Sequence, residues 1–276
     1  MPVVDFHLHA YDFPLSGPAS FLAFLDREVG RPFEEFAREH ATTESYLAVL
    51  DGAGVDVGVV LAEVAPITSG LCSNERVAAL CRSTLRLVPF GSINPFMTAR
   101  ADVELQRIVR ELGIRGLKLY PTYQYFYPND ALLYPLYAKA QELRIPIMWH
   151  TGSSVFKGSR LKYGDPLYLD DVAVDFPELT IIITHSGRPF WYDRAAALAR
   201  FHEHVYMEIA GLPPRRLMTY FPELERLAPK VIYGSDWPGV PTIRENVEAI
   251  RALPLSEAAR TAILGGNAAR ILSLPG

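Results

Sequence analysis

The sequence predicts a (β/α)8 barrel, and three features of the chain support this fold class. The chain has 276 residues, 49% of them hydrophobic and 21% charged, and about 250 residues is typical of such a barrel. It contains eight short apolar runs of the kind that form strands buried on both faces. After a first interval of 54 residues, these runs start 24 to 35 residues apart, which is the spacing of repeated βα units.

The expected strands follow one another along the whole chain. We place them at 3–7, 57–63, 87–93, 116–120, 145–150, 180–185, 204–209 and 230–234. Helices are expected at 99–112, 131–143 and 245–252. Gly113 ends the first helix, Asn129-Asp130 caps the second, and Pro254 follows the third. An open doubly wound sheet would need a glycine-rich phosphate turn after the first strand, where this chain has histidines.

The long first interval predicts an insertion between the first strand and its helix, within residues 10–42. This stretch is rich in Phe, Pro and acidic residues, and we expect it to act as a lid or to pack against a second subunit. No linker or low-complexity tract divides residues 1–276, so a single domain is expected.

Composition and charge narrow the class of function. A net charge of −4 gives no basic face for nucleic acid, and no apolar run of about 18 residues or basic-apolar leader predicts a membrane anchor. Cys72 and Cys81 are expected in one helix, about 13 Å apart and too far for a disulfide. Scarce cysteines suit a cytoplasmic protein. The expected partners are a small-molecule substrate and, in a homo-oligomer such as a dimer, a second copy of the chain.

Candidate metal ligands lie at the ends of the expected strands. The first strand ends in His7-Leu8-His9, and side chains two apart on a strand project from the same face. Four later strands also end in chemically active residues: Lys118, His150, His185 and Asp236. Because strand C-termini meet on one face of a barrel, these groups predict a metal site. Imidazole and carboxylate donors suit Zn²⁺, with Mn²⁺ or Fe²⁺ as alternatives and one or two ions per chain.

Other histidines and strand ends provide a comparison. His202-Glu203-His204 repeats the spacing but precedes the seventh strand, at the opposite face, and is expected to be solvated or capping. His40 lies in the insertion and receives no role. Three further polar residues also end strands and are candidates to line the pocket: Glu63, Asn94 and Glu208.

Lys118 has two alternative interpretations. Alternation in Gly116-Leu117-Lys118-Leu119-Tyr120 points Lys118 into the barrel, where an unpaired ammonium is costly. It could pair with Asp5 or Asp236. Alternatively, CO₂ could carboxylate its neutral amine to a carbamate that bridges two metals.

With these residues in place, the pattern resembles the amidohydrolase superfamily. The resemblance covers the whole chain, with the pair of histidines on strand one, the lysine on strand four, histidines on strands five and six, and aspartate on strand eight. Three segments resemble amidohydrolase family 2, a group of TIM-barrel metal-dependent hydrolases: residues 4–9, 234–238 and 266–272. Residues 116–121 are similar to the segment that carries the carboxylated lysine in dihydroorotase-type enzymes.

The resemblance implies a metal-dependent hydrolase that cleaves a C–N or C–O bond of a small carboxylated or cyclic substrate. Metal-activated water would attack, Asp236 would act as general base and then acid, and His185 would bind a second metal or the oxyanion. Tyr120 and Arg188 are expected to bind substrate, although Arg188 could instead pair with an acid such as Asp193. The alternatives are a metal-dependent non-oxidative decarboxylase of an aromatic or muconate-type acid, or a catalytically silent metal-binding barrel.

Overall fold

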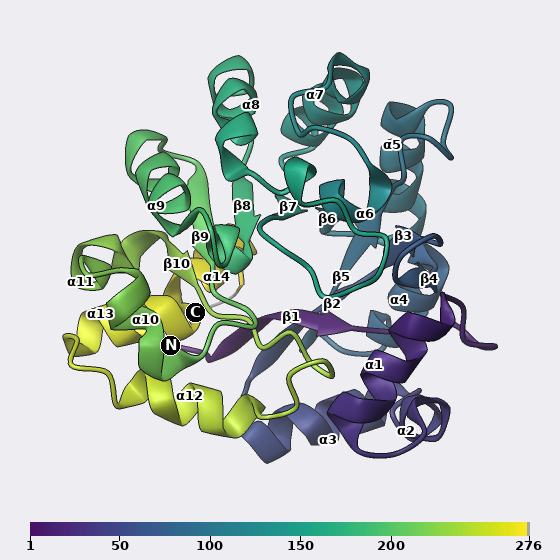
Figure 1. Cartoon of the computed structure of the whole chain (residues 1–276), viewed down its shortest axis with the longest axis horizontal. Coiled ribbons are helices and arrows are strands. Elements are labelled where there is room, and N and C mark those ends of the chain that lie inside the picture. Colours follow the sequence, from purple (N-terminus) through teal and green to yellow (C-terminus); the bar gives the residue numbers. More distant parts are fainter. Residues whose placement is uncertain (275–276) are drawn as a thin grey trace.

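The computed structural model describes residues 1–274 and confirms the (β/α)8 barrel. Its eight barrel strands are β1 (Val4–His9), β2 (Val57–Leu61), β5 (Leu87–Ser92), β6 (Gly116–Leu119), β7 (Ile147–His150), β8 (Ile181–Thr184), β9 (Val205–Glu208) and β10 (Val231–Ile232). Each overlaps a strand expected from the sequence. Neighbouring strands are parallel and adjacent in the order β1-β2-β5-β6-β7-β8-β9-β10 (Figure 1).

The ring closes between β1 and the chain that follows β10. The backbone N–H of Phe6 donates to the carbonyl of Tyr233 at 3.0 Å, and that of His9 donates to Trp237 at 2.9 Å. The N–H of Asp236 donates to the carbonyl of His7 at 3.1 Å. Closure therefore places the last strand-end carboxylate directly beside the first pair of histidines.

Helices surround this ring (Figure 1). They are α1 (Ala19–Val29), α2 (Phe33–Glu39), α3 (Thr43–Ala53), α4 (Asn74–Cys81), α5 (Ala101–Leu112), α6 (Pro121–Gln124), α7 (Tyr134–Glu142), α8 (Leu169–Asp175), α9 (Tyr192–Phe201), α10 (Leu217–Tyr220), α11 (Leu224–Leu227), α12 (Ile243–Arg251), α13 (Glu257–Thr261) and α14 (Asn267–Ile271). Within residues 1–274, no helix combines the length and apolar character needed to cross a bilayer.

Two of the residues expected to mark helix ends do so in the structure, and the expected cap of the third helix does not. α5 ends at Gly113, which adopts φ 72° as a left-handed C-cap, and α12 ends before Pro254. The expected helix 131–143 is a 3₁₀ turn, η1 (Ala131–Leu133), followed by α7. Asp130 precedes η1 without capping it, because its carboxylate accepts the N–H of Tyr127 at 2.8 Å instead.

The prediction that Cys72 and Cys81 share a helix is wrong. An unpredicted antiparallel hairpin, β3 (Glu63–Ala65) and β4 (Gly70–Cys72), follows β2, and Cys72 ends its second strand. Cys81 ends α4, and both thiols are buried and free. The hairpin was hidden because its two three-residue strands are too short to show a period.

Buried apolar side chains form two layers, inside the ring and between the ring and its helices. The inner layer includes Phe6, Phe90, Met148 and Ile182, whereas Leu8 belongs to the outer layer. Simple alternation would place Phe6 and Leu8 on the same face. The register of β1 against β2 shifts between Asp5 and Leu8, and this irregularity lets both Phe6 and His7 face inward.

Residues 10–42 hold α1 and α2, which lie side by side near the start of the ring (Figure 1). They build a small apolar cluster of their own around four buried residues: Phe21, Leu25, Phe33 and Ala37. α3 follows and contacts α12 on the outside of the barrel.

Candidate metal and substrate site

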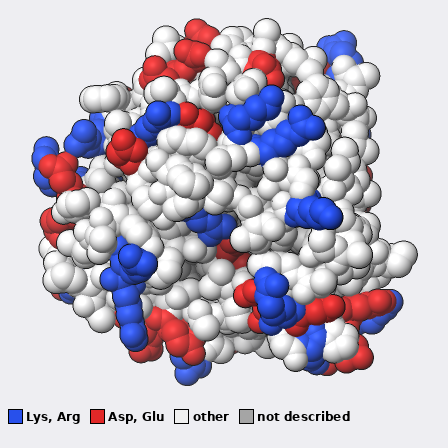
Figure 2. Space-filling view, viewed as in Figure 1, with Lys and Arg blue, Asp and Glu red and all other residues white. Residues whose placement is uncertain are grey.

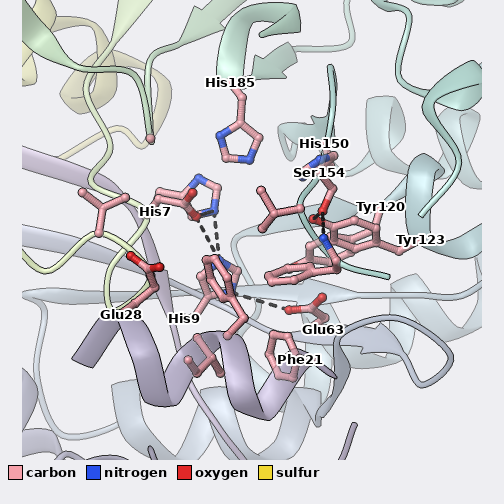
Figure 3. A pocket seen from close by; sticks show the side chains of 18 of the residues that line it. His7, His9, Phe21, Glu28, Glu63, Tyr120, Tyr123, His150, Ser154 and His185 are labelled. Atoms are coloured by element: carbon pink, nitrogen blue, oxygen red, sulfur yellow. Dashed lines mark hydrogen bonds and ion pairs between the residues drawn. The ribbon is translucent and has the colours of Figure 1, made fainter. Parts of the chain in front are cut away.

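A cavity of about 340 Å³ opens at the C-terminal ends of the barrel strands. All eight predicted site residues line it: His7, His9, Lys118, Tyr120, His150, His185, Arg188 and Asp236. Figure 3 shows the histidines around this cavity: His7 and His9 from β1, His150 from the end of β7, and His185 from the turn after β8. The structure thus brings every predicted site residue together, and their chemical roles stay predictions.

Three donor atoms meet where the ring closes. His7 Nε2 lies 3.2 Å from His9 Nε2 and 3.3 Å from Asp236 Oδ1. His9 Nε2 lies 3.4 Å from the same oxygen. Two imidazole nitrogens and one carboxylate at such separations form a donor set that suits a divalent transition metal.

Glu208, at the end of β9, holds two of the histidines in place by hydrogen bonds. Its Oε1 accepts a hydrogen bond from His7 Nδ1 at 3.0 Å, and its Oε2 accepts the backbone N–H of His185 at 3.0 Å. A proton on Nδ1 leaves the Nε2 lone pair of His7 facing His9 and Asp236, as a metal ligand requires. Glu208 ends a strand, but its sequence position gave no sign that His7 would be its partner.

His150 and His185 complete a cluster of imidazoles. Their ring centroids lie 4.7 Å apart, and His185 lies 5.1 Å from His7. His185 Nδ1 donates to the carbonyl of Ala210 at 2.9 Å, whereas the buried His150 Nε2 has no hydrogen-bond partner among residues 1–274. Burial lowers the pKa of all three rings well below the usual value, which keeps them in the neutral form that binds metal.

Backbone strain gathers at two of these strand ends. His185 and Ser186 have φ of 62° and 49°, and Asp236 has φ of 73°. Side-chain-bearing residues rarely adopt this left-handed conformation. Both His185 and Asp236 line the cavity, so the strained backbone lies at the site itself.

Lys118 is fully buried, and its Nζ has no hydrogen-bond partner among residues 1–274. The predicted ion pair with Asp5 or Asp236 is therefore wrong. Asp5 Oδ1 instead accepts the backbone N–H groups of His7 at 3.1 Å and Ser235 at 2.8 Å. Burial lowers the pKa of Lys118 to about 8, which increases the share of neutral amine at neutral pH.

Arg188 lies at the mouth of the cavity beside the ligand carboxylate. Its Nη2 is 3.5 Å from Asp236 Oδ2, and its Nη1 is 3.4 Å from the carbonyl of Ala210. Gly211 has a φ of 67°, and a Cβ there would lie 1.8 Å from that Nη1, so a side chain at this position would be strained and would displace the guanidinium. The guanidinium therefore pairs with Asp236 rather than with Asp193.

Tyr120 and Glu63 line the cavity near the end of β2. The Tyr120 ring lies 5.3 Å from Lys118 Nζ and stacks on Tyr123, with ring centroids 5.7 Å apart. Its hydroxyl donates to the carbonyl of Ala62 at 3.0 Å. Glu63 Oε2 lies 3.6 Å from His9 Nδ1, and Ser69 donates to the other oxygen of Glu63. Asn94 does not line the cavity.

The comparison histidines lie outside the site. His202 precedes β9 and its Nε2 bonds Asp170 Oδ1 at 2.7 Å. His40 packs on Phe36, with ring centroids 4.2 Å apart. The sequence predicted the phenylalanine-rich insertion as a lid or a subunit contact, but it identified neither the side chains of α1 that line the cavity nor those of the loop after β7.

Comparison with known proteins gives matches along the whole chain. A family model described as amidohydrolase matches residues 4–274. The chain is 27% identical over 202 residues to a 2-keto-4-carboxy-3-hexenedioate hydratase of Sphingobium sp. (strain NBRC 103272 / SYK-6). That match covers 61% of this chain and 59% of the relative's length.

Solved structures share the fold over nearly their full lengths. An uncharacterised TIM-barrel protein from Bordetella bronchiseptica is 25% identical with a TM-score of 0.79, covering 99% of both chains. A 5-carboxyvanillate decarboxylase from Sphingomonas paucimobilis is 19% identical with a TM-score of 0.72, covering 99% of both. A probable 2-pyrone-4,6-dicarboxylic acid hydrolase from Acinetobacter baumannii is 18% identical with a TM-score of 0.68, covering 99% of this chain and 100% of its own.

Proposed function

Because the chain belongs to the amidohydrolase family, we propose that it is a metal-dependent hydrolase that cleaves a C–N or C–O bond of a small carboxylated or cyclic substrate. The observation that carries this proposal is the convergence of His7, His9 and Asp236 in a strand-end cavity. We propose zinc as the metal, since nitrogen-rich sites with one carboxylate suit it.

The ligands we propose are His7, His9, His150 and Asp236, with His185 and a carboxylated Lys118 added if a second ion binds. A divalent ion in this site lowers the pKa of water toward neutrality and polarises a carbonyl group. The carboxylated form of Lys118 requires the neutral amine, which burial favours by lowering the pKa of this lysine to about 8.

Asp236 is placed to move the proton. Although burial raises the pKa of this carboxyl, a hydrogen bond with His9 and the guanidinium of Arg188 help to hold it well below its usual value. An ionised Asp236 can accept a proton from the attacking water and return it to the leaving group. His185, whose Nδ1 is fixed by Ala210, presents its other nitrogen to the cavity and can stabilise the developing oxyanion.

When one ion is bound and Lys118 is an ammonium, two cationic groups suit a carboxylate on the substrate; when Lys118 is carboxylated, Arg188 alone does. Arg188 has only a long contact to Asp236, at 3.5 Å, and Lys118 has no anionic partner within hydrogen-bonding distance. A bound carboxylate would supply the missing partner for a buried ammonium.

The same two cations keep decarboxylation as a second candidate. A substrate carboxylate held there is positioned either for binding or for release as CO₂, and a structural neighbour is a decarboxylase. In that reaction Asp236 or His185 would protonate the carbon that loses CO₂.

Metal content per chain is the measurement that tests the proposal. Protein purified without chelator and reloaded in bicarbonate is analysed by elemental mass spectrometry and assayed with lactone, amide and ester panels. Two ions per chain would support a carboxylated Lys118 and hydrolysis. One ion per chain would leave Lys118 as an ammonium and make decarboxylation as well supported as hydrolysis. CO₂ release from aromatic acids would then be the deciding assay. Absence of bound metal would contradict both reactions.

Asp236→Asn provides the matching test of mechanism. We expect turnover to fall by about 10²- to 10⁴-fold, because positioned acid–base groups contribute about that much. Asp193→Asn, on the outer helix α9, is the control. Unchanged turnover in the Asp236 variant would show that the measured activity does not depend on proton transfer by Asp236.

A further inference from the structure

The cavity has two chemically different ends. Its floor, at the strand ends, carries the imidazoles, Asp236 and Lys118 described above. Its opposite side is covered by apolar side chains, which we call the roof: Phe21, Phe24, Leu25, Val155, Phe156 and Val240. Figure 3 shows Phe21 of α1 across the cavity from His185.

α1 contributes half of the roof through one face. Phe21, Phe24 and Leu25 are spaced by three and four residues, so they share a side of the helix. The same face ends in Glu28, the single charged residue that α1 brings to the cavity lining, and Glu28 lies 3.3 Å from Arg27 Nε. The apolar face of α1 is therefore directed at the cavity as well as at its own small cluster.

Phe156, in the loop after β7, joins the two halves of the roof. Its ring centroid lies 4.9 Å from Phe21, 5.2 Å from Phe24 and 5.7 Å from Tyr123. The first two contacts are edge-on, the favourable aromatic geometry. Val155 beside it is 74% exposed, so the roof reaches from the buried floor out to solvent.

A small and purely ionic substrate would contact the floor and leave this apolar surface wet. Covering such a surface is favourable in proportion to the area removed from water. Figure 2 shows charged atoms inside the central hollow, whereas the roof residues that line the cavity are all apolar.

We propose that the substrate carries an apolar alkyl or aryl group that lies against the roof, while its carboxylate or carbonyl end faces the floor. This inference deepens the proposed function and rests on it, because it takes the floor as the reacting end. It assigns α1 and the loop after β7 to substrate selection.

The test uses straight-chain carboxylates from acetate to octanoate, titrated into the metal-loaded protein with Kd measured by calorimetry or ligand-observed NMR. We expect Kd to fall about fourfold for each added methylene until the roof is covered. Phe24→Ala and Val155→Ser should flatten this dependence. Phe201→Ala is the control, because Phe201 ends α9 and is 75% exposed outside the cavity lining.

The outcomes separate this inference from the proposed function, because metal content is measured in the same samples. Equal Kd across the series in metal-loaded wild type would overturn the inference and leave the metal enzyme intact. A steep dependence in protein that holds no metal would support the apolar subsite and contradict the hydrolase. If a roof variant fails to fold, the wild-type series alone tests the inference. If both roof variants fold, a dependence of Kd on chain length as steep as in wild type would also overturn the inference.

Discussion

Glu208 is the residue on which the orientation of the proposed ligands most depends. Its two oxygens hold His7 Nδ1 and the backbone of His185, both at 3.0 Å, and it is completely buried. Carboxylates that orient ligand histidines in this way typically contribute 10- to 100-fold in metal affinity.

We therefore expect Glu208→Gln to weaken zinc binding by about 10- to 100-fold, because an amide can accept only one of the two hydrogen bonds well. Competition with a chromophoric chelator measures the Kd. Glu111→Gln, at an exposed helical position, is the control. Unaltered zinc affinity together with a native circular dichroism spectrum would show that Glu208 does not position His7.

Individual site residues were predictable from the sequence because strand ends are visible in it. His7, His150 and Asp236 each follow an apolar run, and a barrel brings such positions to one face. The partners of these residues were not predictable. An ion pair of Lys118 with Asp5 or Asp236 was one of two interpretations, yet Asp5 accepts the backbone N–H of Ser235 and Lys118 Nζ has no hydrogen-bond partner among residues 1–274.

At the scale of elements, the insertion supports the segment that carries Asp236. Trp237 follows that aspartate and is 4% exposed. Its ring packs against three other rings. The centroid distances are 5.7 Å to Phe36 of α2, 5.4 Å to His40 and 5.4 Å to Tyr46 of α3. Tyr46 also donates to the carbonyl of His9 at 2.7 Å. α2 and α3 therefore pack against Trp237, and α3 also bonds His9, so these helices support both segments that close the ring.

Trp237→Ala should lower the free energy of unfolding by about 3–5 kcal/mol, the usual cost of removing a buried tryptophan from a packed cluster. Chemical denaturation followed by circular dichroism measures the change. Trp191→Ala, at a half-buried position, should cost less. Equal losses in the two variants would mean that the contacts of Trp237 with α2 and α3 contribute nothing specific.

Long elements were predicted better than short ones. α5 shows both an amphipathic pattern and Gly113 as a stop signal, whereas the β3–β4 hairpin offers only two three-residue strands. Asp130 illustrates a second limit, because its carboxylate could cap the following turn or bond Tyr127. The sequence contains both alternatives, and tertiary packing decides between them.

At the scale of the whole molecule, the barrel was predictable because all eight units repeat the same pattern. For the covering of the cavity, the sequence left two alternatives open, a lid or a subunit contact, and it did not show that Phe21 and Phe24 of α1 meet Phe156, more than 130 residues further along the chain. Such contacts leave no periodicity, and the insertion could equally have packed on a second subunit. The roof is therefore the part of the site for which the structure was essential.

The reactivity of the two buried cysteines should indicate whether the barrel is folded or open. Cys72 and Cys81 are 2% and 5% exposed, and both belong to the layer between the ring and the helices. Burial raises the pKa of Cys81 to about 12 and that of Cys72 well above its usual value. Since the thiolate is the reactive form, the folded protein should react with a disulfide reagent at pH 8 only when it opens.

We expect neither thiol to react rapidly in native protein and both to react at once in denaturant, as measured by the absorbance of released thionitrobenzoate. Zinc should slow the native reaction if labelling follows global opening, because an ion bound only by the folded state stabilises that state. Comparing Cys72→Ser with Cys81→Ser identifies which thiol is labelled. Fast labelling of Cys72 that zinc does not change would instead show that the β3–β4 hairpin opens by itself while the barrel stays closed.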